Sequence, residues 1–91
     1  MLFLISYKFN DSNAQEKGSK ILKELYEDVG PQNRPEDYDV QSRIFLPQHS
    51  NGYSIVDADS LETIWRKWQP CRELLELTIE PSADLDQTLA L

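Results

Sequence analysis

Few residues in this chain have the types and the spacing that catalysis or metal binding requires. Histidine occurs once, as His49, and cysteine occurs once, as Cys71, so one subunit can build neither a histidine-based metal cage nor a disulfide. His49 lies in a polar turn, where a solvated side chain explains it better than a general base. Cys71 follows Pro70 with no neighbouring base, which is typical of a small buried residue rather than a nucleophile. We therefore predict no catalytic residue and no metal ligand.

The acidic residues also fail to form a recognisable site. Asp57 and Asp59 are not followed by the glycine of a calcium-binding loop, so turn and helix-cap chemistry explains them better. Glu73, Glu76 and Glu80 are not paired at general acid–base spacing and mark a solvated strand face. Glycine-rich phosphate loops, zinc motifs and hydrolase nucleophile motifs are absent from the sequence, so we predict no cofactor.

Aromatic residues offer the best candidates for a ligand pocket. Trp65 and Trp68 are three residues apart, on one face of a predicted helix together with Leu61 and Ile64, a pattern typical of a buried stripe. The alternative is that an indole lines a cavity between helix and sheet, because a buried indole N–H needs a hydrogen-bond partner. We take Tyr53, Trp65 and Trp68 as the residues expected near such a pocket.

Composition excludes several classes of partner. The chain has 91 residues, and its nine Lys and Arg are scattered among sixteen Asp and Glu, for a net charge of −7. Phosphate contacts need clustered basic residues, so neither nucleic acid nor an anionic membrane surface is an expected partner. The single cysteine fits a reducing compartment, and no stretch approaches membrane-spanning length, so we predict a cytoplasmic protein.

The elements that must position these side chains follow from apolar periodicity. Ser12 and Gln15 match a capping box at the start of the first helix, and Gly30 and Pro31 end that helix. The predicted elements are strands over residues 2–9, 38–46, 53–58 and 74–80 and helices over residues 12–29 and 60–69. Together they predict one domain over residues 1–81, followed by an acidic tail over residues 82–91.

The order strand–helix–strand–strand–helix–strand predicts an α+β, ferredoxin-like fold. Right-handed crossovers place both helices on one face of a four-stranded antiparallel sheet with strand order 4-1-3-2. Strand alternation then directs Leu75, Leu77 and Ile79 toward the helices. The opposite, bare face is what a dimer would cover, and the residues expected in that dimer interface are Arg43, Phe45, Leu74, Glu76 and Glu80.

Arg43 carries a specific expectation for the dimer. An arginine buried on the bare face needs a carboxylate partner, so we predict that Arg43 pairs with Glu76 or Glu80 across the two-fold axis. The alternative is that its side chain extends to solvent along the rim of the sheet.

Three segments give the chain a family resemblance: the start Met1–Ile5, the tryptophans Trp65 and Trp68, and the acidic-apolar stretch Glu73–Pro81. On these residues the chain resembles the dimeric α/β-barrel superfamily of ferredoxin-like domains, and within it a small uncharacterised family of about this length. The resemblance implies a homodimer whose two sheets face each other as a barrel. It implies no catalytic residue.

Function remains open between three classes. The sequence favours a homodimeric small-molecule-binding or regulatory module, with a small apolar molecule as ligand. One alternative is a cofactor-independent monooxygenase or isomerase that acts on a small apolar substrate. Another is a structural or partner-binding subunit without a ligand, and a solid core between helices and sheet would leave only this class.

Overall fold

The computed structural model describes residues 1–29 and 37–83. The elements run in chain order as β1 (Leu2–Phe9), α1 (Ser12–Val29), β2 (Tyr38–Leu46), the 3-10 turn η1 (Pro47–His49), β3 (Asn51–Ala58), α2 (Leu61–Trp68), the 3-10 turn η2 (Gln69–Leu74) and β4 (Leu75–Ser82). The predicted helix stop at Gly30 and Pro31, and nearly all of the predicted tail over residues 82–91, lie outside the described residues.

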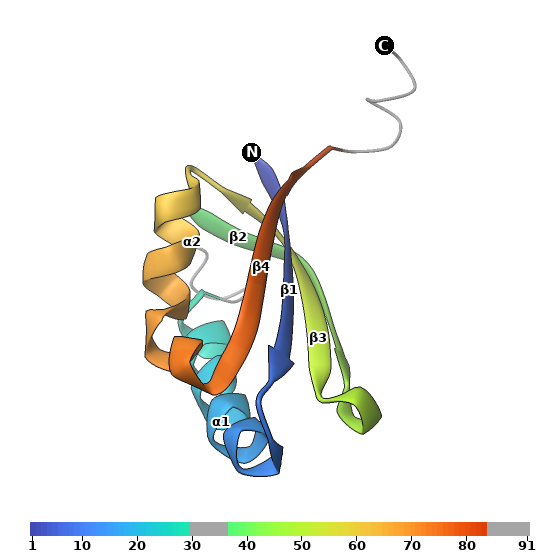
Figure 1. The fold of residues 1–91 in the computed structure, drawn as a ribbon. Helices are drawn as coiled ribbons and strands as arrows, with labels where there is room; N and C mark the ends of the chain where they lie inside the picture. The colour runs from blue at the N-terminus through green and yellow to red at the C-terminus, as the bar shows by residue number, and fades with distance from the viewer. Residues whose placement is uncertain (30–36, 84–91) are drawn as a thin grey trace.

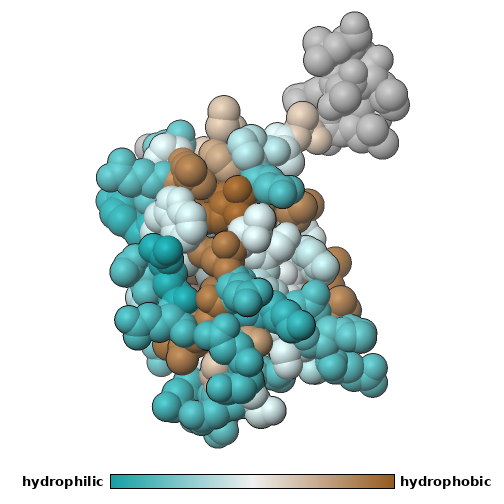
Figure 2. Space-filling view, in the orientation of Figure 1, coloured by the Kyte–Doolittle hydropathy of each residue, from teal (hydrophilic) through white to brown (hydrophobic). Residues whose placement is uncertain are grey.

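The four strands form one antiparallel sheet in the order β2-β3-β1-β4, and both helices cover the same face of it (Figure 1). This arrangement confirms the predicted α+β, ferredoxin-like fold and its strand order. β1 is one of the two central strands of the sheet. Its residues Phe3, Ile5 and Phe9 lie on the face toward the helices and are buried. Apolar side chains accordingly gather along the seam between helices and sheet (Figure 2).

Helix α1 begins with a different cap from the one expected. The Asp11 carboxylate accepts a hydrogen bond from the backbone N–H of Ala14 at 2.7 Å, so Asp11 rather than Ser12 satisfies the first turn. Gln15, the other half of the predicted capping box, instead accepts a hydrogen bond from the Ser50 hydroxyl at 2.5 Å. The helix start is therefore joined to the turn between β2 and β3.

The sequence allows Asp59 or Ser60 to cap helix α2, and the structure has Ser60, whose hydroxyl accepts a hydrogen bond from the Thr63 N–H at 3.2 Å. Ile64 and Trp68 are buried as expected, at 0% and 3% exposure. Leu61 is not part of the buried stripe, since it is 44% exposed and Thr63 takes the buried place in the first turn.

Strand β4 has the predicted register. Leu75 is buried, and Leu77 and Ile79 pack partly buried against the core. Leu74 departs from the expectation: it belongs to η2 and packs against the core, so it does not lie on the bare face of the strand. Glu76 and Glu80 lie on the bare face as predicted and are exposed.

Strand β2 contains a β-bulge that reverses its faces. Val40 pairs with Val56, but the next paired residue is Ser42, opposite Ile55, so Gln41 is an extra residue. From this point each side chain lies on the face opposite to the one that simple alternation gives. Arg43 and Phe45 therefore face the helices, and their predicted position on the bare face is wrong.

Candidate functional site

A hollow lies between α1 and the sheet. Gly52 and Ser54 are the β3 residues that face the helices at this end. The Tyr7 phenol lies over Gly52, where a Cβ would overlap it, and the small Ser54 lines the hollow. The hollow contains a pocket of about 240 Å³, lined by Tyr7, Phe9, Ser19, Leu22, Lys23, Arg43, Ile44 and Phe45. A smaller hollow of about 40 Å³ adjoins it, lined by Tyr7, Leu22, Leu25, Tyr38, Val40, Arg43, Ser54 and Trp68. Because Tyr7, Leu22 and Arg43 line both, we treat the two as one cavity and call it the helix-side pocket.

Aromatic rings form the wall of the helix-side pocket. Tyr7 of β1 and Phe45 of β2 are both paired with Gly52, which lies between them. Over this glycine the centroids of the two rings are 6.4 Å apart, and the ring planes are 8° from parallel. Phe9 meets Phe45 edge to face at 6.0 Å, so the wall is a connected aromatic surface.

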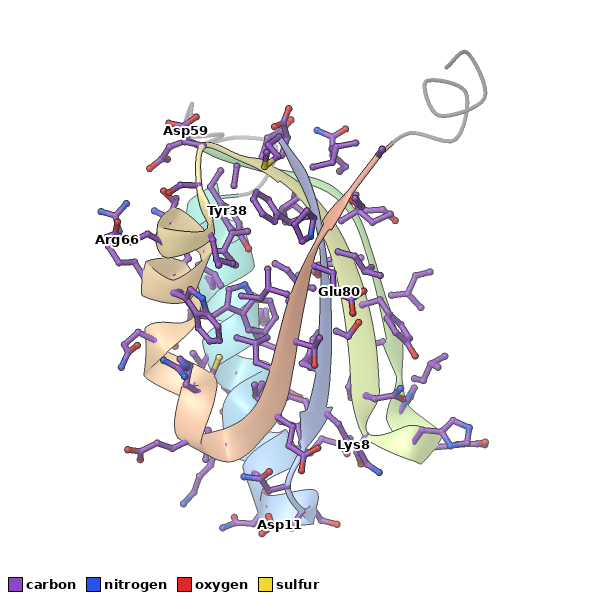
Figure 3. The ribbon with its side chains drawn as sticks, turned by 45° about the horizontal axis from the view of Figure 1, so that its top comes forward. Lys8, Asp11, Tyr38, Asp59, Arg66 and Glu80 are labelled. Carbon is purple, nitrogen blue, oxygen red and sulfur yellow. The ribbon has the colours of Figure 1, made fainter. Side chains whose placement is uncertain are left out.

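The deep end of the pocket is fixed by one buried hydrogen bond. The indole N–H of Trp68 donates to the Tyr38 hydroxyl at 3.0 Å. Tyr38 and Trp68 are 2% and 3% exposed, and Figure 3 shows Tyr38 in the layer between the helices and the sheet. Burial raises the pKa of Tyr38 to about 12, so its hydroxyl is protonated at neutral pH and accepts from the indole as a neutral group.

The polar groups at the pocket are cationic or neutral. Arg43 and Lys23 are the charged side chains among the described residues that line it, and Ser54 adds a hydroxyl that is 9% exposed as a residue. Burial raises the pKa of the Tyr7 phenol, and the nearby Arg43 charge opposes that rise only in part. Tyr7 is thus a neutral hydrogen-bonding group beside a guanidinium.

The three pocket residues predicted from sequence do not come together. Trp68 lies at the deep end of the helix-side pocket. Trp65 is half-buried and does not line the pocket; the Arg72 guanidinium stacks on its ring at 4.2 Å. Tyr53 is on the bare face of the sheet, because its neighbours Gly52 and Ser54 are the residues turned toward the helices.

Tyr7, Arg43 and Phe45 line the pocket but were not predicted to do so. Tyr7 could have been found, because it shares the parity of the buried Phe3, Ile5 and Phe9 on β1. The inward position of the two β2 residues depends on the bulge at Gln41, for which the sequence has no glycine or proline signal.

Neither His49 nor Cys71 lines the pocket. His49 is exposed in η1. Cys71 is 1% exposed, and its thiol donates to the Trp68 carbonyl at 3.4 Å. Burial raises the pKa of the thiol to about 11, so it is not a ready nucleophile at neutral pH. In residues 1–29 and 37–83, no group of three His, Cys, Asp or Glu side chains is placed to hold a metal ion.

The bare face of the sheet divides into an apolar part and a polar part. Large apolar side chains are exposed on β2 and β3: Ile44 at 57%, Tyr53 at 40%, Ile55 at 39% and Leu46 at 39%. On β1 and β4 a shallow groove of about 160 Å³ is lined mainly by polar groups, among them Lys8 and its paired neighbour Glu76.

Comparison with known proteins places this fold in a family. The sequence matches the family described as "Domain of unknown function (DUF3303)" over residues 1–91, and the chain belongs to that family. A search of curated proteins found no match. The fold is similar to the crystal structure of a "putative antibiotic biosynthesis monooxygenase" from Deinococcus radiodurans, with a TM-score of 0.55, 10% identity, and coverage of 92% of this chain and 94% of that one.

This likeness shows a shared fold, and the family match confirms that the chain belongs to a family of unknown function, as expected. Within the described part of the chain, no helix is both long and apolar enough to cross a membrane.

Proposed function

We propose that this protein is a homodimeric module that binds a small, largely apolar molecule in the helix-side pocket. The observation that carries the proposal is the hollow between α1 and the sheet, walled by Tyr7, Phe9 and Phe45. If the core had been solid at this place, a structural or partner-binding subunit without a ligand would have been the only class left. The pocket of about 240 Å³ is below the roughly 300–1,000 Å³ typical of ligand sites, which suits a molecule of one or two rings.

We propose binding rather than catalysis because of the groups that line the pocket. Among the described residues that line the pocket there is no histidine and no carboxylate to act as a general base. The tyrosines are the remaining titratable oxygen groups, and their raised pKa values keep both Tyr7 and Tyr38 protonated at neutral pH. The monooxygenase or isomerase alternative would therefore need the substrate to supply its own reactive group.

We expect the neutral two-ring amide 2-naphthamide to bind the wild-type protein at this pocket. Titration followed by 1H–15N NMR should shift the backbone amide signals of Phe45 and Ser54 and the indole signal of Trp68 in a saturable way. The indole signal of Trp65, which does not line the pocket and is covered by Arg72, should stay unchanged as an internal control.

A matched pair of variants locates the binding. Ser19 is exposed on α1 at the mouth of the pocket, so Ser19→Phe should block entry and abolish the shifts without disturbing the core. Lys20 is also exposed but does not line the pocket, so Lys20→Phe should bind like wild type. Wild-type protein that shows no saturable shift, or a Ser19→Phe variant that binds normally, would contradict the proposed pocket.

The homodimer part of the proposal rests on the bare face. β3 turns the large residues Tyr53 and Ile55 outward and the small residues Gly52 and Ser54 toward the helices. A strand that is covered only on the helix side would have its large apolar residues on that side instead. Exposed apolar patches of this kind mark interaction sites, and a second copy offers the same surface in a two-fold arrangement. Glu76 and Glu80 lie on this face. Arg43 does not, so the proposed contact no longer includes the pairing argued from a bare-face Arg43.

Light scattering should give twice the chain mass for the wild-type protein. Ile55→Glu should give a monomer that keeps its fold, because it places a carboxylate among the exposed apolar side chains of the bare face, and Ile55 is not part of the buried core. Glu62→Gln, an exposed change on the helix side, serves as the control. A wild-type monomer at all concentrations tested would refute the dimer and leave the pocket proposal standing.

A further inference from the structure

Chemical specificity in the helix-side pocket begins with the bulge in β2. Without the extra residue Gln41, alternation would place Arg43 on the bare face. Because of the extra residue, Arg43 is opposite the buried Ser54 in the register of β2 and β3 and faces the helices. β-Bulges re-aim side chains in this way, often next to binding sites. The bulge thus puts a guanidinium at the junction of the two hollows, which Arg43 lines together with Tyr7 and Leu22.

The charge around the pocket is opposite to the charge of the chain. The protein carries sixteen acidic residues and a net charge of −7, yet the charged side chains in the described lining are Arg43 and Lys23. Such a local reversal favours an anionic ligand group over a neutral or cationic one. An arginine has five N–H donors in a fixed fork, so it can take a carboxylate bidentately and still keep another contact.

The remaining lining restricts the shape of the ligand. Tyr7 and Phe45 present nearly parallel rings, and Phe9 meets Phe45 edge to face, so the wall suits a flat apolar body. The Ser54 hydroxyl lies opposite Arg43 in the sheet and provides a neutral donor close to where an acid group would sit.

On the basis of the proposed binding function, we infer that the natural ligand is a planar apolar acid of one or two rings. Its carboxylate pairs with the Arg43 guanidinium, and its ring lies against Tyr7 and Phe45. Lys23, which is exposed at the mouth of the pocket, adds a longer-range attraction for the anion.

The test compares two probes of nearly the same shape, 2-naphthoate and the neutral 2-naphthamide, by the NMR titration described above. In wild-type protein the carboxylate should bind at least about tenfold more tightly than the amide, as a charge-assisted bidentate pair predicts. Arg43→Gln should bring the two affinities within about threefold, mainly by weakening the binding of 2-naphthoate. Arg43→Lys keeps the charge but not the fork, and should give an intermediate preference.

Arg66→Gln is the matched control, because it removes one positive charge from a side chain that points away from the sheet (Figure 3). It should keep the wild-type preference. If both probes bind wild type equally, or if Arg43→Gln keeps the preference for the carboxylate, the acid assignment is overturned while the pocket itself stands. If neither probe shifts the pocket signals, the proposed function fails and this inference fails with it.

Discussion

Ile64→Ala should lower the free energy of unfolding by about 2–5 kcal/mol, the cost of a lost apolar contact plus the cavity that it leaves. Ile64 is 0% exposed on the inner face of α2, where the rigid sheet below limits how far the site can collapse. Urea unfolding at one fixed protein concentration measures the change, because a dimer would make the midpoint depend on concentration.

Leu61→Ala provides the matched control for this prediction. Leu61 lies three residues earlier on the same helix and was expected in the same buried stripe, yet it is 44% exposed. Its truncation should change stability by no more than about 0.5 kcal/mol. Equal losses at both positions would mean that α2 is rotated about its axis relative to the structure described above.

Gly18→Ala should destabilise the protein by about 1–3 kcal/mol, although alanine is the better helix former by about 0.5–1 kcal/mol. A Cβ at Gly18 would overlap the ring of Phe9, which is 3% exposed and held between α1 and the sheet. The glycine therefore allows α1 to approach β1 closely, and the helix would have to move outward to accept a methyl group.

The double variant with Phe9→Leu separates overlap from other causes. In the Phe9→Leu background the ring is gone, so adding Gly18→Ala should cost clearly less than it does in the wild type. Thermal or urea unfolding of the four proteins in the cycle gives the coupling energy. A stabilising effect of Gly18→Ala in the wild type would show that the close approach does not exist.

The spacing of apolar residues, together with the residues that end helices and strands, was enough to predict most of the fold. The bounds predicted for β1 and β2 agree with the structure, because Asn10 and Pro47 end runs of strand-forming residues without ambiguity. The order of elements, combined with the handedness of crossovers, then gave the sheet order β2-β3-β1-β4. These features depend on many residues at once, so a single exception does not change them.

Face assignments were less predictable because single residues decide them. The run from Tyr38 to Leu46 alternates equally well with or without an extra residue at Gln41, so Arg43 and Phe45 were assigned to the wrong face. On β3, Tyr53 was expected at the pocket, although Gly52 and Ser54 are the residues that face the helices. Gly52 leaves room for the Tyr7 ring that forms part of the pocket wall, and hydrophobicity scales do not register that requirement.

The bulge in β2 also affects the rim of the sheet. β2 and β4 are the two outermost strands, and the outer side of each presents backbone N–H and C=O groups that another extended chain could pair with. An unpaired extra residue at Gln41 breaks the regular spacing of those groups on β2, while Pro81 lacks an N–H near the end of β4. The same irregularity that points Arg43 inward therefore makes strand-by-strand aggregation along this rim less favourable.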